Sequence, residues 1–227
     1  MTSSRDIVFA SVRRALGVTS QEAPRRREVA DRLSNHPRGL VPERGQQPPA
    51  ERLALFTDMV VAAAASIDHL ASLDQVPGAI AAYLRSRNLP PTLLRGADAR
   101  LAALPWGLEP NLDVWIGPSD GRQLAGLSHA FAGIAETGTL VMLSGPDNPS
   151  TLNLLPDHHL VMVEAADIAA DYETVWGRIR ARFGEGVMPR TVNWITGPSR
   201  SADIEQTLLL GAHGPRSLHV LLVGAAA

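Results

Sequence analysis

Apolar and polar positions in the first fifty residues predict one short helix followed by an arm without a regular pattern. Apolar residues recur at helical spacing within 3–16, with serine before them and Gly17 after them. Serine and glycine are typical of the two ends of a helix. Residues 17–50 are rich in Arg, Pro and Gln and poor in large apolar side chains. We therefore expect residues 1–50 to form an N-terminal helix and a flexible, extended arm.

From residue 51 onward, helical and strand patterns alternate. Helical spacing of apolar residues predicts helices over 51–65, 77–88, 167–184 and 202–214. Apolar runs between turn residues predict strands over 92–96, 112–117, 138–144, 159–165, 191–199 and 217–224. This alternation predicts an α/β fold for residues 51–227, with a central, largely parallel sheet flanked by helices.

Composition and charge exclude several classes of protein. The 227 residues are 45% hydrophobic and carry a net charge of -2, so the chain can bury a core and has no general attraction for nucleic acid. The sequence contains no cysteine and no lysine. Disulfides, a thiolate nucleophile, cysteine-ligated iron–sulfur clusters and a Schiff-base lysine are therefore excluded.

The apolar runs also bear on location. The longest one, over 59–66, is too short to cross a bilayer, and charged residues interrupt the first segment of the chain. We therefore expect a cytoplasmic protein without a membrane span.

The stretch TGPSRSADIEQTLLLGAHGP, residues 196–215, is a first candidate site. Between a strand and a helix, backbone N–H groups and the helix dipole would favour an anion, and Arg200 could bind phosphate or carboxylate through two hydrogen bonds. Asp203 and Glu205 argue against this, because acidic side chains in the first turn satisfy the same dipole. Alternatively, these acids bind sugar hydroxyls or an arginine of a partner, or a serine of the turn simply caps the helix.

A second candidate lies in the stretch FAGIAETGTLVML. Glu136 stands among small and apolar residues and is followed by Thr-Gly-Thr. A carboxylate is costly to bury unless it is paired, so Glu136 is either a general base or nucleophile with a raised pKa or a structural partner of an arginine such as Arg200. Both interpretations remain open.

The two stretches are expected to converge. Loops that leave strands of a parallel sheet gather at its carboxyl edge, where ligands bind. One pocket wall would come from the turn around residue 197, with Glu136 opposite and His213 at the edge. Glu136 is the candidate catalytic residue, and the candidate ligand-binding residues are Thr137, Gly138, Thr139, Gly197, Pro198, Ser199, Arg200, Asp203, His213 and Gly214.

A metal site is not expected. Asp157, His158 and His159 are adjacent, but neighbouring side chains of an extended segment point to opposite faces and cannot easily reach one ion. His219 falls in the last predicted strand and is interpreted as a histidine of the core.

Three stretches together resemble a known family. GIAETGTLVML, HHLVMVEAADI and TGPSRSADIEQTLLLGAHGPRSLHVLLV closely resemble the bacterial lactate-utilisation protein C family, whose common unit is the LUD domain. The resemblance covers residues 51–224. It implies an α/β fold of the sugar-phosphate isomerase and CoA-transferase-like type, in which a glutamate in a glycine-bearing loop is the nucleophile of the transferases.

The resemblance also implies a role in oxidising L-lactate to pyruvate, together with two iron–sulfur proteins. Without cysteine, this chain would be the cluster-free accessory subunit, with no cofactor of its own and the clusters on its partners. The isolated chain is then not expected to be active, although a small organic acid or phosphate could bind to it. The alternative is an independent enzyme acting on a small phosphorylated, acyl-CoA or folate-like substrate.

Overall fold

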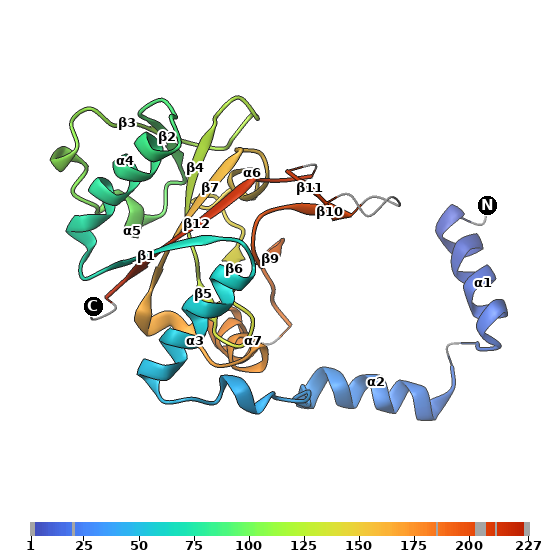
Figure 1. Cartoon of the computed structure of the whole chain (residues 1–227). Helices are drawn as coiled ribbons and strands as arrows, with labels where there is room; N and C mark the ends of the chain where they lie inside the picture. Colours follow the sequence, from blue (N-terminus) through green and yellow to red (C-terminus); the bar gives the residue numbers. More distant parts are fainter. Residues whose placement is uncertain (1–2, 20, 185, 203–207, 212, 225–227) are drawn as a thin grey trace. The chain divides into compact units, whose positions relative to one another are not determined.

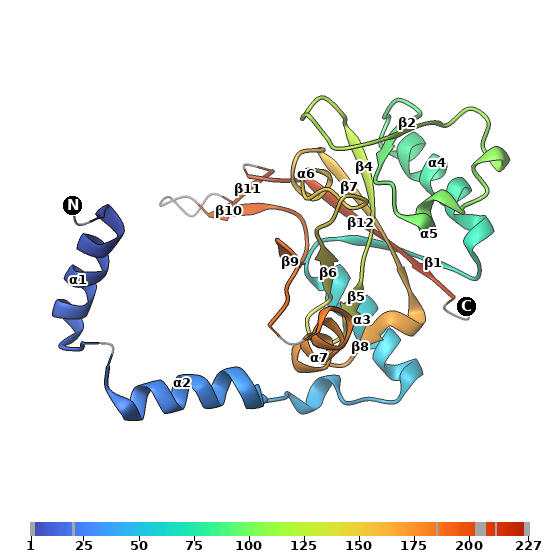
Figure 2. The same ribbon diagram turned by 180° about the vertical axis from the view of Figure 1, so that it is seen from behind.

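The computed structural model describes residues 3–19, 21–184, 186–202, 208–211 and 213–224. Contacts within the chain divide it into two units, Met1–Leu40 and Val41–Ala227. Figures 1 and 2 show the course of each unit from opposite sides.

The first unit consists of two helices, α1 (Ser4–Leu16) and α2 (Ala23–Asn35). The predicted helix over 3–16 is confirmed, with a reciprocal cap between Ser3 and Asp6 at its start and left-handed Gly17 at its end. The prediction of an extended arm was wrong over α2. Its sequence, APRRREVADRLSN, has only Val29 and Leu33 as large apolar residues, so it lacks the broad apolar stripe by which a helix is recognised.

The second unit is built on a six-stranded sheet in which every pairing is parallel, confirming the predicted fold class. Its strands, in spatial order, are β1 (Ser66–Leu70), β12 (Ser217–Val223), β7 (His158–Glu164), β4 (Ala125–His129), β2 (Thr92–Arg95) and β3 (Asp113–Ile116). The central strands are buried on both faces, as in other parallel sheets covered by helices. Figure 1 shows these strands crossing the middle of the unit.

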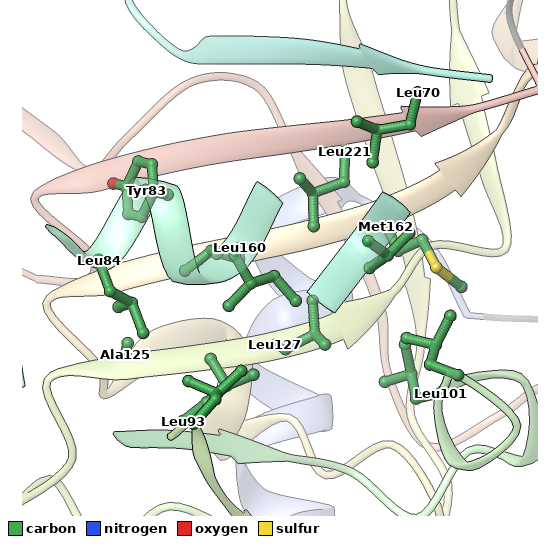
Figure 3. Close-up of a cluster of buried hydrophobic side chains, with 14 of the residues drawn as sticks. Leu70, Tyr83, Leu84, Leu93, Leu101, Ala125, Leu127, Leu160, Met162 and Leu221 are labelled. Atoms are coloured by element: carbon green, nitrogen blue, oxygen red, sulfur yellow. The ribbon is translucent and has the colours of Figure 1, made fainter. Parts of the chain in front are cut away.

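Side chains alternate along each strand, so the sheet packs against a hydrophobic core on each of its two faces. Leu160 and Met162 of β7 pack with α4 (Val76–Ser86) and α5 (Ala99–Ala102), as Figure 3 shows. Their neighbours Val161 and Val163 join the core on the other face. That second core includes Phe56 and Val60 of α3 (Pro49–Ala62).

A second sheet, which the sequence did not predict, covers this other face. Its strands, in spatial order, are β8 (Ile168–Ala169), β5 (Ala132–Ile134), β6 (Thr139–Leu143) and β9 (Val192–Ile195), and β6 runs antiparallel to both of its neighbours. Helix α7 (Tyr172–Phe183) packs on it through Val175 and Ile179. The strand predicted over 191–199 therefore belongs to a mixed sheet rather than to the parallel one.

Two predicted helices need correction. Helix α7 begins at Tyr172 rather than at Asp167, because Asp171 is its N-cap and accepts a hydrogen bond from the amide of Thr174. The helix predicted over 202–214 was also wrong. Ala202 lies in a strand, and so does Leu208–Leu210. A short apolar run does not distinguish the period of a helix from that of a strand.

Several short elements complete the second unit: η1 (Glu43–Gly45), η2 (Leu73–Gln75), η3 (Trp106–Leu108), α6 (Thr151–Leu154) and η4 (Ala165–Asp167). Among the described residues, every helix is too short or too polar to cross a membrane.

Candidate functional site

Two paired strands lie in the described part of the first candidate stretch, where a helix was expected. Strands β10 (Arg200–Ala202) and β11 (Leu208–Leu210) pair antiparallel, with Arg200 opposite Leu210. No helix starts within the described residues after β9, so an anion site on a helix N-terminus is ruled out there. Asp203, another predicted ligand-binding residue, lies outside the described residues.

The turn before these strands is fixed against the end of α3. Gly197 has a φ of +70°, and a Cβ there would collide with the carbonyl oxygen of Ala63. The guanidinium of Arg200 donates a hydrogen bond to the same oxygen. A cation at a helix C-terminus also interacts favourably with the helix dipole. Gly197 and Arg200 therefore anchor the turn on α3.

A pocket of about 240 Å³ opens beside this turn. Five predicted ligand-binding residues line it: Gly197, Pro198, Ser199, His213 and Gly214. The two segments are held together by backbone bonds, because the amide of Ser199 donates to Pro215 at 2.9 Å and that of Gly211 donates to Ser199 at 3.0 Å. The structure thus brings together residues from both ends of the stretch.

The buried wall of the pocket carries a chain of polar side chains that sequence reasoning missed. Ser128 donates a hydrogen bond to the Oδ1 of Asn153 at 3.0 Å, and its Oγ lies 3.1 Å from the Nε2 of His159. All three residues are buried, and Asn153 and His159 line the pocket. They come from β4, α6 and β7, so no local motif could have united them.

His159 is held neutral in this wall. Complete burial lowers its pKa from 6.5 to about 3. The Nδ1 of the ring has no hydrogen-bond partner among the described residues. If Nε2 donates to Ser128, which itself donates to Asn153, then Nδ1 carries the lone pair. The imidazole therefore belongs to the pocket wall as a neutral ring whose Nδ1 is buried.

The pocket lies at an unexpected edge of the main sheet. His159 and Leu218, both in its lining, stand near the amino ends of β7 and β12. The predicted position at the carboxyl edge assumed that the strand before Gly197 belonged to the parallel sheet. This strand, β9, instead runs antiparallel to β6 in the second sheet.

The hydroxyl groups of the second candidate stretch hydrogen-bond to other side chains of the protein. The Oγ1 of Thr139 lies 2.7 Å from that of Thr137, 2.9 Å from the Tyr172 hydroxyl and 2.6 Å from the Oγ1 of Thr196. Gly138, with a φ of +66°, leaves no room for a Cβ against the backbone of α3. The cluster joins this turn to the pocket at Thr196, which is part of the lining.

Glu136 is buried but is not part of the described pocket lining. Its Oε2 has no hydrogen-bond partner among the described residues, and a Cβ built at Gly45 would lie 3.3 Å from its Cβ. Among ion pairs between described residues, none joins it to Arg200. The pairing of Glu136 with Arg200 was therefore wrong, because Arg200 is exposed and bonds to α3.

The adjacent His158 and His159 point to opposite faces of the strand, as strand geometry requires. His158 contacts the Tyr83 hydroxyl at 3.0 Å, whereas His159 bonds to Ser128. His219 is a buried histidine of the core, as predicted, with its Nδ1 2.8 Å from the Oγ of Ser66. Within the described part of the chain, no group of three or more histidine and acidic side chains could hold a metal ion.

Comparisons with known proteins find a LUD domain over residues 58–223. A protein of Neisseria meningitidis serogroup B of uncharacterised function is 36% identical over 146 residues, 62% of this chain and 61% of that protein. Lactate utilization protein C of Bacillus subtilis is 36% identical over 99 residues, 43% of this chain and 41% of its own. Lactate utilization protein C of Exiguobacterium is 31% identical over 139 residues, 58% of this chain and 60% of its own.

These matches span between two fifths and three fifths of the length of the curated relatives. A crystal structure of a DUF162 family protein from Deinococcus radiodurans superimposes with a TM-score of 0.61 at 28% identity. It covers 78% of this chain and 99% of its own. Since the family model matches more than half of the 227 residues, this chain belongs to the LUD-domain family.

Proposed function

We propose that this protein is a component of a system that oxidises L-lactate to pyruvate and that it acts with two iron–sulfur proteins. The observation that carries the proposal is its LUD domain, shared with relatives named for lactate utilisation. Oxidising lactate releases two electrons and two protons. These 227 residues contain no cysteine, so the clusters that accept the electrons would be bound by the partners.

The pocket beside Gly197 is the proposed ligand site of this component. Its wall is largely apolar, with Trp194, Ile195 and Leu218, and its polar groups are few. Such a site suits a small molecule held by hydrogen bonds to Ser199 and His213. Its volume of about 240 Å³ suits a small molecule.

Growth on L-lactate tests this proposal. A strain lacking the gene should fail to grow on L-lactate as sole carbon source and should grow normally on pyruvate. The wild-type gene should restore growth, and Ser199→Leu, which fills the pocket, should not. His213→Ala should weaken growth, and His69→Ala is its matched control, since both rings are exposed and only His213 lines the pocket. Normal growth of the deleted strain on L-lactate would overturn the proposal.

A second candidate function is an independent enzyme acting on a small phosphorylated, acyl-CoA or folate-like substrate. The buried chain of His159, Ser128 and Asn153 at the pocket favours it, because these hydrogen bonds fix a neutral imidazole in the pocket wall without any partner protein. A substrate of this kind turned over by the purified chain, with loss of turnover in His159→Leu, would support this alternative.

A further inference from the structure

A cavity of about 460 Å³ opens beside the first strand of the main sheet and shares no lining residue with the pocket at Gly197. It is lined by Ser66 and Asp68 of β1, by His219 of β12 and by the end of α4 with Arg87. A smaller cavity of about 220 Å³ also has Ser66 and Arg87 in its lining. Hydroxyl, carboxylate, imidazole and guanidinium groups therefore meet in one place. We refer to the larger cavity as the Ser66 cavity.

Strand register brings Ser66, Asp68 and His219 together. Strand β1 pairs parallel with β12, and Ser66 lies opposite His219. Since alternate residues of a strand lie on one face, Asp68 shares the face of Ser66. Leu70 and Leu221 are the next members of these two series, and Figure 3 shows them in the core against which α4 packs. The serine and the carboxylate therefore flank one imidazole from the neighbouring strand.

The distances give the three side chains the order serine, histidine, aspartate. The Oγ of Ser66 lies 2.8 Å from the Nδ1 of His219, and the Nε2 of the same ring lies 3.4 Å from the Oδ2 of Asp68. This Nε2 is buried and makes no hydrogen bond of good geometry within the described part of the chain. Hydrogen bonds of catalytic groups are often long before a substrate binds. With the Nε2 proton drawn to Asp68, Nδ1 carries the lone pair and can accept the proton of Ser66.

His219 is fixed in place and held in its neutral form. Its ring stacks on that of Tyr83, with centroids 4.4 Å apart and an angle of 24° between the planes. Burial lowers the pKa of His219 below its ordinary value; Asp68 opposes this shift and Arg87 adds to it. On the other side of β12, strand β7 presents the apolar Leu160, so the ionisable groups around the ring come from β1 and α4. A neutral imidazole beside a serine hydroxyl can act as its general base.

Ser66 can be reached from outside the protein. It is only half-buried and lines both cavities. Strand β1 is the first strand of the described sheet, so no described strand covers its outer side. The side chain of Asp68 is 48% exposed, and Arg87 is exposed as well. A ligand needs to contact Ser66 alone, because the buried ring of His219 acts through its contact with the serine Oγ.

The charges of the cavity favour an uncharged ligand. Arg87 and Asp68 both line it, and their opposite charges leave no net attraction for an ion. The guanidinium of Arg87 lies over the ring of Tyr83, 5.5 Å from its centroid. Arg87 forms no ion pair with another described residue. Its N–H groups can therefore donate to a carbonyl oxygen that becomes negative during a reaction.

We infer that the Ser66 cavity is a hydrolytic site for small neutral carboxylic esters, with Ser66 as nucleophile, His219 as general base and Asp68 as the residue that positions the imidazole. The Oγ of Ser66 attacks the carbonyl carbon while its proton passes to Nδ1 of His219. The C–O bond of the ester breaks, the alcohol leaves with this proton, and the acyl group stays on Ser66.

Water completes the cycle. It attacks the acyl carbon, gives one proton to Nδ1 and releases the acid, after which this proton returns to the Oγ of Ser66. Ester and water thus become acid and alcohol, and no other reactant is needed. The inference does not depend on the role in lactate oxidation. It concerns a different cavity from the Gly197 pocket, so each can fail alone.

A fluorophosphonate probe tests the nucleophile in the full chain, because such probes react with activated serine hydroxyls and stay attached. The wild-type chain should take up a single probe, and peptide mapping should place it on Ser66. Ser66→Ala should take up none. Ser86→Ala should be labelled like the wild type, because Ser86 lines the same cavity but its hydroxyl donates to the carbonyl of Tyr83. A wild-type chain that is unlabelled at Ser66 would overturn the inference, whether or not the variants fold.

Hydrolysis of p-nitrophenyl acetate tests the reaction. The wild-type chain and Ser86→Ala should hydrolyse the ester faster than buffer does, and Ser66→Ala should fall to the buffer rate. Asp68→Asn should lower the rate and move the rising limb of the pH–rate profile to lower pH, because the carboxylate that raises the pKa of His219 is lost. A purely structural role of Asp68 would leave that limb in place. Wild-type rates in Ser66→Ala, or an unshifted profile in Asp68→Asn, would refute the assignment.

Discussion

Replacing His159 by leucine should make the protein less sensitive to acid. The folded-state pKa of His159 is about 3, below its ordinary value of 6.5, because the ring is buried. Between these two values the unfolded chain binds a proton that the folded protein does not bind. Stability attributable to His159 is therefore intact above pH 6.5 and is lost progressively as the pH falls toward 3.

The size of the effect follows from this window. One pKa unit corresponds to about 1.4 kcal/mol. When the pH is lowered from 7 to 5, the roughly 1.5 pH units below 6.5 are those in which only the unfolded chain binds the proton. His159 alone should thus remove about 2 kcal/mol from the free energy of unfolding over this range. The carboxylates and the other histidines add pH dependence of their own, which the variant shares with the wild-type protein.

Urea unfolding at pH 7 and pH 5 measures the effect. The loss of unfolding free energy between the two pH values should be smaller in His159→Leu than in the wild-type protein by about 2 kcal/mol. His69→Leu is the matched control and should show the wild-type loss, because His69 is exposed whereas His159 is buried. Equal losses in His159→Leu and the wild-type protein would refute the conclusion that His159 is buried in its neutral form.

Three further predictions concern the two units. Gly197→Ala should lower the unfolding free energy by about 1–3 kcal/mol, since the backbone is left-handed there and the added methyl group collides with Ala63. The control Gly177→Ala, whose Cβ meets nothing within 4 Å, should not lower it. Equal effects of the two variants in urea unfolding would contradict this prediction. Arg200→Ala should lower the unfolding free energy by only about 0.5–1.5 kcal/mol, because one exposed hydrogen bond is lost. A loss of about 3 kcal/mol or more, as for a broken buried ion pair, would contradict this and support an ion pair between Arg200 and Glu136. Trypsin should cut first at Arg25–Arg27, in a helix without buried side chains, and a first cut within Val41–Ala227, detected by mass spectrometry, would contradict that.

The sequence was a good guide where local pattern and burial agree. Strands such as His158–Glu164 are continuous apolar runs in the chain and are buried on both faces in the structure. Helix α1 carries serine and glycine at its ends and was placed almost to the residue. The family motifs likewise identified the turn at Gly197 and the segment around His213, which share one pocket.

The rest depended on contacts that no local pattern records. Strand β9 was recognised as a strand, but whether it joined the parallel sheet or β6 was decided by tertiary packing. That choice moved the pocket to the amino ends of β7 and β12 and left Glu136 outside its described lining. Ser128 and Asn153 are 25 residues apart in the chain and meet only through a buried hydrogen bond, so their place beside His159 could not be predicted.

The most direct test of the proposed role is L-lactate-dependent dye reduction in an extract of cells that lack this protein. The extract should be inactive, the purified chain alone should also be inactive, and the two together should be active, because the electrons must pass to clusters on partner proteins. Chain carrying Ser199→Leu should fail to restore the activity, since the substituted side chain occupies the pocket. An extract that reduces the dye equally well without the chain would contradict the proposed role, and so would activity of the purified chain alone.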